Sequence, residues 1–346
     1  YVKAGPAGRE NIRAHNSALV LRLLWADSKG LSRSDIARES GLSKATVSAI
    51  VTELTEAGLV VEGRQQTSSG GRPGTTLRFR HDHYRIIGVE LGASHVTVIR
   101  MNLAGEIQDS RSLRHDVRDD PSGAIRLTNR LIDETIDACD RPVIGMGIGV
   151  PAPLHAETPG RISARVHPKW ADVDVHAEFG ACRPFPVRLE NDANLGALAE
   201  HWWGSGQNCT DFTYVKVSTG VGAGLIIDGD IYRGPGGIAG ELGHMVIEGN
   251  ARPSQINDLL GSDHLLHWAY TEAEASADPA DTYPYGFDMD FLTTAAKSGQ
   301  PSAVKVVQQA GHWLGIALSN LCNITNPSQV VIGGPLTAAG EVLMQP

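Results

Sequence analysis

The sequence predicts an α/β protein that consists of a small, mainly helical head and a larger body with two lobes. Three observations support this fold class. The first 80 residues contain three stretches with apolar residues at helical spacing, followed by two short β-like runs. The body contains two copies of a strand, a glycine turn and a second strand, which indicates an internal duplication. Between these copies in the sequence, the run 186–199 reads as a strand, a polar turn and a helix.

Length and composition are those of a globular protein with two or three domains. The chain has 346 residues, of which 41% are hydrophobic and 20% are charged. Its four cysteines are widely spread with no paired spacing, which favours a reducing cytoplasm over a disulfide framework. No apolar run is long enough to span a bilayer and no signal peptide opens the chain, so we expect no membrane partner. The chain begins with Tyr1, so we expect its true start to be missing.

Charge is distributed unevenly along the chain. Residues 1–80 contain 12 Lys and Arg against 7 Asp and Glu, a net charge of +5. The remainder contains 18 against 32, a net charge of −14. A basic head on an acidic body favours a polyanionic partner for the head, although a chance imbalance of surface charge would give the same numbers.

The head has the element order of a winged helix-turn-helix. A first helix ends near residues 27–30, and a capping box at Ser32 and Asp35 opens a second. A third begins at Leu42-Ser43 and ends near Gly58, with an apolar stripe formed by Val47, Ile50, Val51 and Leu54. Runs 59–62 and 75–79 read as two strands joined by a flexible loop. This segment resembles bacterial winged-helix repressors.

The third helix carries the residue types suited to DNA recognition. Small, mostly polar side chains and one cation face outward near its start: Ser43, Lys44, Ala45, Thr46 and Ser48. Small side chains let a helix lie deep in the major groove, and Arg72 at the loop tip suits the minor groove. The alternatives are an ordinary exposed helix face and a disordered linker. We predict that the head binds double-stranded operator DNA.

The polar turn at 189–194 admits two interpretations. It follows a strand and opens a helix, where α/β proteins place ligand-binding groups. Asp192 could accept a proton from a hydroxyl, and Asn191 could donate to one or accept from one. The alternative is an Asn-Asp helix cap that needs no ligand. Likewise, the glycine turns near residues 92 and 220 could hold phosphates or be plain hairpin turns.

The body resembles the ROK family (repressors, open reading frames and kinases), which has the actin-like sugar kinase fold. The first glycine turn matches, as do Gly147-Ile148-Gly149-Val150-Pro151-Ala152-Pro153, Glu190-Asn191-Asp192-Ala193-Asn194, Thr219-Gly220-Val221-Gly222-Ala223-Gly224, Gly240-Glu241-Leu242-Gly243-His244, Asn326-Pro327 and Ile332-Gly333-Gly334. The resemblance implies a head at 1–80, a first lobe at 84–192 and a second lobe at 193–346. The family continues beyond Pro346, so we expect part of the second lobe to be missing.

Departures from the kinase pattern imply that nucleotide binding is weak or lost. Kinases of the family have an Asp at the position of Glu90, followed by Gly-Gly-Thr where this chain has Gly92-Ala93-Ser94. The added side chains crowd the backbone that a phosphate would approach, although the second glycine turn is intact. In a kinase Asp192 would be the catalytic base. Here the resemblance implies a vestigial base that only binds.

The residues of the expected sugar pocket match the family pattern better than those of the first glycine turn do. The resemblance implies that Asn191, Asp192, Glu241 and His244 bind the hydroxyl groups of a sugar, and these residue types suit that task. Trp170 lies in a loop that lines the pocket in relatives; the alternative is a surface aromatic.

The resemblance implies a structural zinc site, but the sequence does not contain all of its ligands. The family usually binds it through His244 and three cysteines, yet no cysteine lies between Cys209 and Cys322. Either the zinc loop has been lost, or the sequence omits a mobile loop after Pro253. We favour omission.

Together these features predict a cytoplasmic, sugar-responsive transcriptional regulator, a repressor of carbohydrate-utilisation genes with a non-catalytic effector body. We expect a monosaccharide or a derivative as ligand, and a homodimer or a dimer of dimers on inverted half-sites. One alternative is an active ATP-dependent sugar kinase that carries a DNA-binding head. Another is a regulator whose body binds a partner protein.

Overall fold

The computed structural model describes residues 9–65, 75–154, 160–162, 168–249, 252–276 and 278–345. The chain divides into two compact units. The first comprises residues 1–88, 99–111 and 132–146, and the second comprises residues 89–98, 112–131 and 147–346. The predicted head therefore belongs to the first unit, whereas the segments of the predicted sugar pocket belong to the second.

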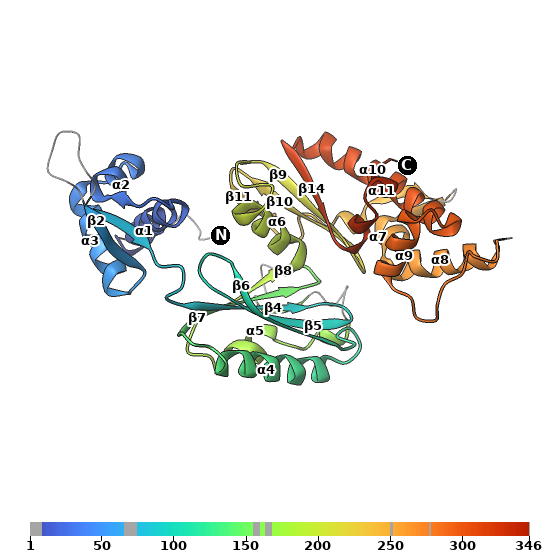
Figure 1. Ribbon diagram of the computed structural model, residues 1–346, viewed down its shortest axis with the longest axis horizontal. Helices are drawn as coiled ribbons and strands as arrows, with labels where there is room; N and C mark the ends of the chain where they lie inside the picture. Colours follow the sequence, from blue (N-terminus) through green and yellow to red (C-terminus); the bar gives the residue numbers. More distant parts are fainter. Residues whose placement is uncertain are drawn as a thin grey trace. The chain divides into compact units, whose positions relative to one another are not determined.

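The head has the predicted order of three helices followed by two strands (Figure 1). The helices are α1 (Arg9–Ala26), α2 (Arg33–Ser40) and α3 (Lys44–Glu56), and the strands are β2 (Val60–Gln65) and β3 (Thr75–Phe79). The structure adds a two-residue strand, β1 (Leu31–Ser32), which completes a sheet of order β1-β3-β2. A strand of two residues is too short to leave a periodic signal in the sequence.

Local sequence signals fix the ends of these helices. Ser32 and Asp35 form the predicted capping box at the start of α2. Gly41, at the end of that helix, has a φ angle of +70°, which glycine adopts without the strain that a side chain would bring. The apolar stripe of α3 packs with residues of α1, α2 and the sheet into one core, whose members include Val20, Leu24, Ile36, Val47, Ile50, Val51, Leu54 and Leu77.

The first sheet of the body has five strands in the order β6-β5-β4-β7-β8. They are β4 (Arg85–Leu91), β5 (His95–Met101), β6 (Ile107–Arg114), β7 (Val143–Val150) and β8 (Val187–Asn191). The helices of this part of the chain are α4 (Pro121–Asp137), the 3-10 helix η1 (Pro168–Trp170) and α5 (Val175–Gly180). Strands β4 and β5 are the first predicted strand–turn–strand copy.

The second sheet has the order β11-β10-β9-β14. Its strands are β9 (Phe212–Val217), β10 (Val221–Ile227), β11 (Asp230–Tyr232) and β14 (Gln329–Gly333). Strands β9 and β10 pair antiparallel across the second glycine turn, and β14 pairs parallel with β9. Helix α6 (Asp192–Trp203), which begins at the polar turn, packs across β9 and β10 (Figure 1). The second copy of the duplication is thus present as predicted.

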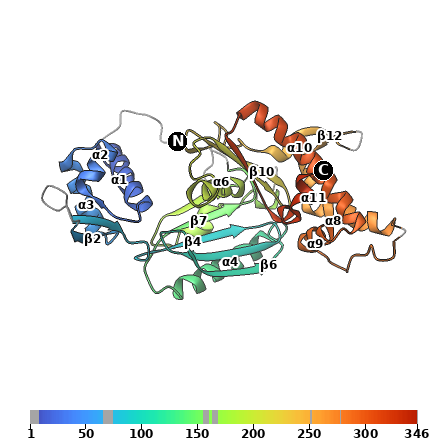
Figure 2. The same ribbon diagram turned by 45° about the horizontal axis from the view of Figure 1, so that its top comes forward.

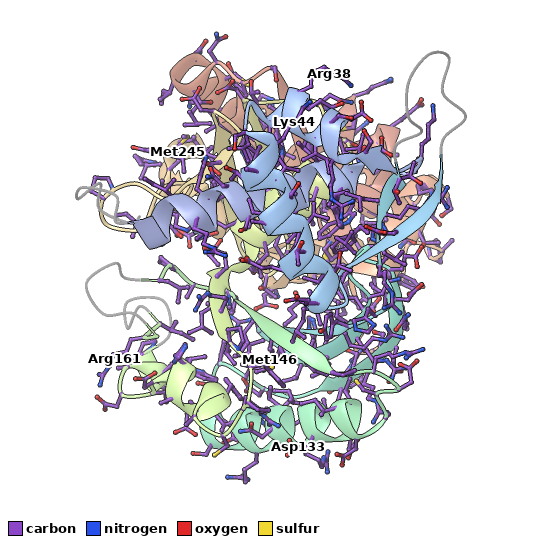
Figure 3. The ribbon with its side chains drawn as sticks, turned by 90° about the vertical axis from the view of Figure 1, so that its left-hand side faces the viewer. Arg38, Lys44, Asp133, Met146, Arg161 and Met245 are labelled. Carbon is purple, nitrogen blue, oxygen red and sulfur yellow. The ribbon has the colours of Figure 1, made fainter. Side chains whose placement is uncertain are left out.

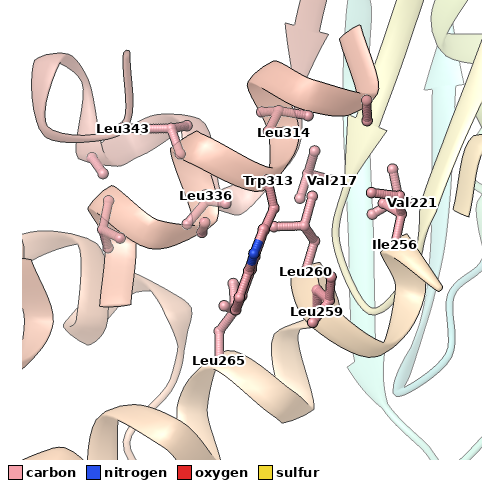
Figure 4. Packing of buried hydrophobic residues seen from close by; sticks show 14 of the residues in the cluster. Val217, Val221, Ile256, Leu259, Leu260, Leu265, Trp313, Leu314, Leu336 and Leu343 are labelled. Carbon is pink, nitrogen blue, oxygen red and sulfur yellow. The ribbon is translucent and has the colours of Figure 1, made fainter. Parts of the chain in front are cut away.

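A helical layer completes this part of the chain. It contains α7 (Ile256–Leu260), α8 (Ser262–Glu274), α9 (Met289–Lys297), α10 (Pro301–Thr325) and α11 (Glu341–Met344), with the 3-10 helices η2 (Leu242–His244) and η3 (Pro335–Ala339). Helix α10 contacts α8, α9 and α11 (Figure 2). Buried Trp313 of α10 packs among Leu260, Leu265 and Leu336 (Figure 4). A hairpin of β12 (Val246–Gly249) and β13 (Arg252–Gln255) precedes α7.

Among the residues described, we find no helix that combines the length and the apolar character needed to cross a membrane.

Candidate functional site

Helix α3 presents the predicted DNA-reading residues at its amino-terminal end. Lys44, at the first position of α3, is exposed (Figure 3), and so are Ala45 and Ser48. The hydroxyl of Ser43 caps the helix: it accepts from the Thr46 backbone N–H at 3.1 Å and lies 2.8 Å from the Thr46 hydroxyl. Ser43 and Thr46 therefore stabilise the helix as well as facing outward. Arg72 lies outside the described residues.

The polar turn before α6 is a helix cap, as one of the two interpretations predicted. Asn191 is the N-cap residue, and its Oδ1 accepts from the backbone N–H groups of Ala193 at 2.9 Å and Asn194 at 3.1 Å. With its carbonyl oxygen engaged, Asn191 can offer a ligand its NH2 group. Capping and ligand binding are therefore compatible at this residue.

Asp192 is the first residue of α6 and contacts a lysine that the sequence analysis did not identify. Its Oδ1 accepts from the Ala193 N–H at 2.7 Å, and its Oδ2 accepts from Lys216 Nζ at 2.8 Å. Lys216 lies in β9, directly before the second glycine turn. A lysine in the otherwise uncharged run 212–217 was the available signal, because a charge on a central strand usually has a buried partner.

Lys216 also contacts a second carboxylate, that of Glu90. Its Nζ lies 3.5 Å from Glu90 Oε1, and His95 Nε2 lies 3.4 Å from Glu90 Oε2. The hydrogen bond from His95, helped by the charge of Lys216, lowers the pKa of Glu90 to about 2 despite its partial burial. The same hydrogen bond to Glu90 raises the pKa of His95. The structure thus forms a chain of contacts from Asp192 through Lys216 and Glu90 to His95, which we call the charge chain.

The first glycine turn is covered by a side chain. A methyl group placed on Gly92 would lie 2.5 Å from the imidazole of His95, so this ring sits directly against the turn. From the sequence, Glu90 and the added bulk at Ala93 and Ser94 are expected to weaken phosphate binding. Ala93 is buried, and the structure identifies His95 as the group that covers the backbone.

Glu241 lies directly before the 3-10 helix η2, and His244 lies in it. Burial raises the pKa of Glu241, the nearby His244 opposes this rise, and the negative charge of Asp192 adds to it. His244 Nε2 is 3.7 Å from Glu241 Oε2, a long contact. Helix α6 and the 3-10 helix η2 both contact strand β10, so the segments that carry Asp192 and His244 lie against the same strand.

The residues present do not fit a structural zinc. Nδ1 of His244 is 3.1 Å from Oε1 of Gln255, an amide oxygen and a poor zinc ligand. Strands β12 and β13 close the segment as a hairpin, with Val246 opposite Gln255. Within the described ranges, no group of three or more His, Cys, Asp or Glu side chains could hold a metal ion.

Trp170 is a buried residue, so the alternative of a surface aromatic is wrong. Its side chain is 1% exposed, and its indole N–H donates to the Val117 carbonyl at 2.7 Å. Since that donor has a protein acceptor, any contact with a ligand would use the ring. The sugar-binding role of Trp170 stays a prediction.

Glu190 stabilises the polar turn, a role that the sequence did not predict. Its Oε2 accepts from Nε and Nη2 of Arg233 at 2.9 and 2.6 Å, and its Oε1 accepts from the Asn191 N–H at 3.0 Å and from Asn194 Nδ2 at 2.9 Å. This carboxylate fixes the backbone on which Asn191 and Asp192 stand.

The second glycine turn is braced from α7. The backbone N–H of Val221 donates to Asn257 Oδ1 at 2.8 Å, and a methyl group on Gly243 would lie 2.1 Å from the same oxygen. Asn257 therefore joins the turn to the segment that carries Glu241 and His244, and the close approach requires glycine at position 243.

Comparison with known proteins gives matches along nearly the whole chain. Residues 86–346 match the model of the ROK family, and residues 18–61 match a winged helix-turn-helix DNA-binding model. The xylose repressor of Caldicellulosiruptor bescii is 31% identical over 95% of this chain and 85% of its own length. The N-acetylglucosamine repressor of Escherichia coli O157:H7 is 29% identical over 96% of this chain and 83% of its own.

Solved structures agree with these matches. The crystal structure of a ROK family transcriptional regulator, a homologue of the E. coli MLC protein, superposes with a TM-score of 0.80 at 26% identity. It covers 96% of this chain and 86% of that one. A ROK family glucokinase from Streptomyces griseus, in complex with glucose and AMPPNP, superposes with a TM-score of 0.66 at 24% identity over 75% of this chain and 86% of that one. The likeness to the glucokinase shows a shared fold and nothing about activity.

Proposed function

This chain belongs to the ROK family, and we propose that it represses genes of carbohydrate use when a neutral monosaccharide is absent. It is a sugar-responsive DNA-binding regulator rather than an enzyme: a winged helix-turn-helix precedes the ROK body, and close relatives over most of its length are repressors. One observation carries the finer proposal. The carboxylate that would act as catalytic base, Asp192, is held by the ammonium group of Lys216 at 2.8 Å.

Charge pairing around Asp192 favours a ligand without a phosphate. Lys216 faces the two carboxylates of Asp192 and Glu90, and Arg233 faces that of Glu190. Glu241 adds another acidic group beside them. In the described part of this cluster, carboxylates thus outnumber the lysine and arginine cations, so a phosphate would meet net repulsion. Hydroxyl groups, by contrast, can donate to Asp192 and Glu241 and accept from Asn191.

Relatives indicate which sugars to test first. Their names point to xylose and N-acetylglucosamine. We propose that an unphosphorylated sugar of this kind binds Asn191, Asp192, Glu241 and His244. We propose that no nucleotide is needed, because His95 covers the first glycine turn. The head would read inverted half-sites as part of a homodimer or a dimer of dimers, in the cytoplasm where operator DNA lies.

Thermal unfolding in the presence of candidate sugars tests the proposal. A ligand that binds the folded state raises the unfolding temperature, and the stabilisation grows with the logarithm of its concentration over its Kd. We expect a rise with one of xylose, glucose or N-acetylglucosamine, and none with the corresponding sugar phosphate. Asp192→Ala should abolish the rise while operator affinity in a gel-shift assay stays near that of the wild type. A full response in Asp192→Ala would defeat the assignment of this residue.

A further inference from the structure

Lys216 is a partly buried cation whose own role in the site has not been explained so far. Its side chain is 21% exposed, and its Nζ lies between the carboxylates of Asp192 and Glu90 at 2.8 and 3.5 Å. The three residues come from different elements: Glu90 from β4, Asp192 from the start of α6 and Lys216 from β9. One ammonium group therefore ties together three segments that are far apart in the sequence.

The ammonium group stays charged at this place. Burial by itself would lower the pKa of Lys216, but the negative charges of Asp192 and Glu90, with the hydrogen bonds that they accept, outweigh burial and raise it. A buried charge is tolerated when it is paired and hydrogen-bonded, and this one has two acidic partners. Removing Lys216 would leave two carboxylates facing one space with no cation between them.

Two carboxylates that face one space are the kind of groups that hold a divalent cation in a phosphoryl-transfer site. Magnesium in such sites is held by one or two carboxylates together with the phosphates of the nucleotide. Here the position between the two carboxylates is filled by the chain's own ammonium group, and the imidazole of His95 lies against the neighbouring glycine turn. A magnesium–nucleotide does not fit residues arranged in this way.

We propose that Lys216 is a built-in cation that takes the place of a divalent metal ion and holds Asp192 in position for the sugar. It is thus a positioning residue for sensing, and it makes the site independent of metal. The positioning role rests on the proposed sugar contact of Asp192. The replacement of a metal does not, since it depends only on the two carboxylates and the ammonium group.

The test is a gain of metal binding when the cation is removed. Mn²⁺ is the probe, followed by its electron paramagnetic resonance signal and by calorimetry, without nucleotide. We expect wild type and Lys216→Arg to bind no Mn²⁺ at millimolar concentration. Lys216→Met, whose side chain is similar in length, should bind one ion per chain. The double variant Lys216→Met/Glu90→Gln should lose that ion, because one of the two carboxylates is gone.

Sugar titrations by calorimetry complete the test. The sugar is the one that shifts the unfolding temperature of the wild type. We expect Lys216→Met to bind it at least about tenfold more weakly and Lys216→Arg to retain most of the affinity. The replacement of a metal is overturned if wild type binds Mn²⁺ as well as Lys216→Met does or if folded Lys216→Met binds none. The positioning role is overturned if the sugar affinity of Lys216→Met is unchanged.

Folding and function are kept separate by two controls. Circular dichroism verifies that each variant is folded. If Lys216→Met does not fold, the double variant Lys216→Met/Asp192→Asn tests whether repulsion between the two unpaired carboxylates is the cause. Lys216→Gln, which keeps both carboxylates, then replaces Lys216→Met in the Mn²⁺ titration. If no sugar binds the wild type, the proposed function fails, whereas the Mn²⁺ result still decides whether Lys216 replaces a metal.

Discussion

Helix α3 and the polar cluster around Asp192 place their functional residues in opposite ways. In α3, buried Val47, Ile50 and Val51 hold the fold, while exposed Lys44 and Ser48 face the solvent. Helical geometry keeps these two sets apart. In the cluster, by contrast, Asn191 caps α6 and Asp192 holds Lys216, and both are predicted to bind sugar. A substitution in α3 can therefore alter fold or function separately, whereas one in the cluster alters both.

The largest effect is expected from a substitution that unfolds the head and leaves the body folded. Val47 is fully buried, so Val47→Asp would place an unpaired carboxylate in the small core of the head. This change should destabilise the head by on the order of 4 kcal/mol and abolish operator binding. Thr52→Asp, an exposed position on the same helix, is the matched control and should leave the head folded. Gel shift and circular dichroism measure both, and sugar binding by Val47→Asp should persist. Its loss would show that the two functions share one fold.

A pair of substitutions at Asn191 separates capping from ligand binding. Asn191→Ala removes the side chain that accepts from two backbone N–H groups, so we expect a loss of about 1 kcal/mol in the free energy of unfolding. Asn191→Ser keeps a capping oxygen and should restore most of that stability. Both variants lack the amide NH2 and should bind sugar about tenfold more weakly. Full sugar affinity in Asn191→Ser, measured by calorimetry, would mean that Asn191 serves only as a cap.

The sequence predicted the head well because its signals are local. The apolar stripe of α3, the capping box at Ser32 and the glycine at position 41 each lie within a few residues of the feature that they determine. The paired strand–turn–strand segments were found for the same reason. The two-residue strand β1 was missed, since its pairing with β3 depends on residues 31 and 77, which are far apart in the chain.

The site was predicted only in part, because its decisive contacts are not local. Motifs predicted that Asn191, Asp192, Glu241 and His244 bind sugar, and this role stays a prediction. The structure shows that α6 and η2 both contact β10. Lys216 was missed because its partner Glu90 is 126 positions away. Periodicity could not show that His95 folds back over Gly92, nor that Trp170 is buried with its indole donor on Val117. Such contacts depend on how distant segments pack.

A smaller effect is expected on the exposed side of α3. Lys44 is exposed at the start of the helix, so Lys44→Ala should leave the head folded. Losing one cation near DNA phosphates should weaken operator binding about tenfold and reduce the slope of log K against log salt by about 1. Lys29→Ala removes the same charge from an exposed turn and serves as the matched control. Equal losses in the two variants would mean that general charge, and not the position on α3, determines binding.

The smallest expected effect lies at the end of the charge chain, where His95 meets Glu90. The hydrogen bond to Glu90 raises the pKa of His95 above its ordinary 6.5, against burial and the charge of Lys216, which lower it. A group with a raised pKa stabilises the fold fully below its unfolded pKa and loses this contribution as pH rises through the folded pKa. Glu90 is ionised throughout, because its own pKa is about 2.

The difference in the free energy of unfolding between wild type and His95→Gln should therefore be largest below the ordinary pKa of histidine, about 6.5, and should decrease as the pH rises through the raised pKa of folded His95. The side chains of His95 and Glu90 are 38% and 42% exposed, so the difference should stay below about 1 kcal/mol. Urea unfolding at several pH values measures it. In a Glu90→Gln background the pH dependence should disappear, because the acceptor that favours the charged imidazole is gone. A difference that grows with pH would show that His95 acts through packing on the glycine turn and not through its charge.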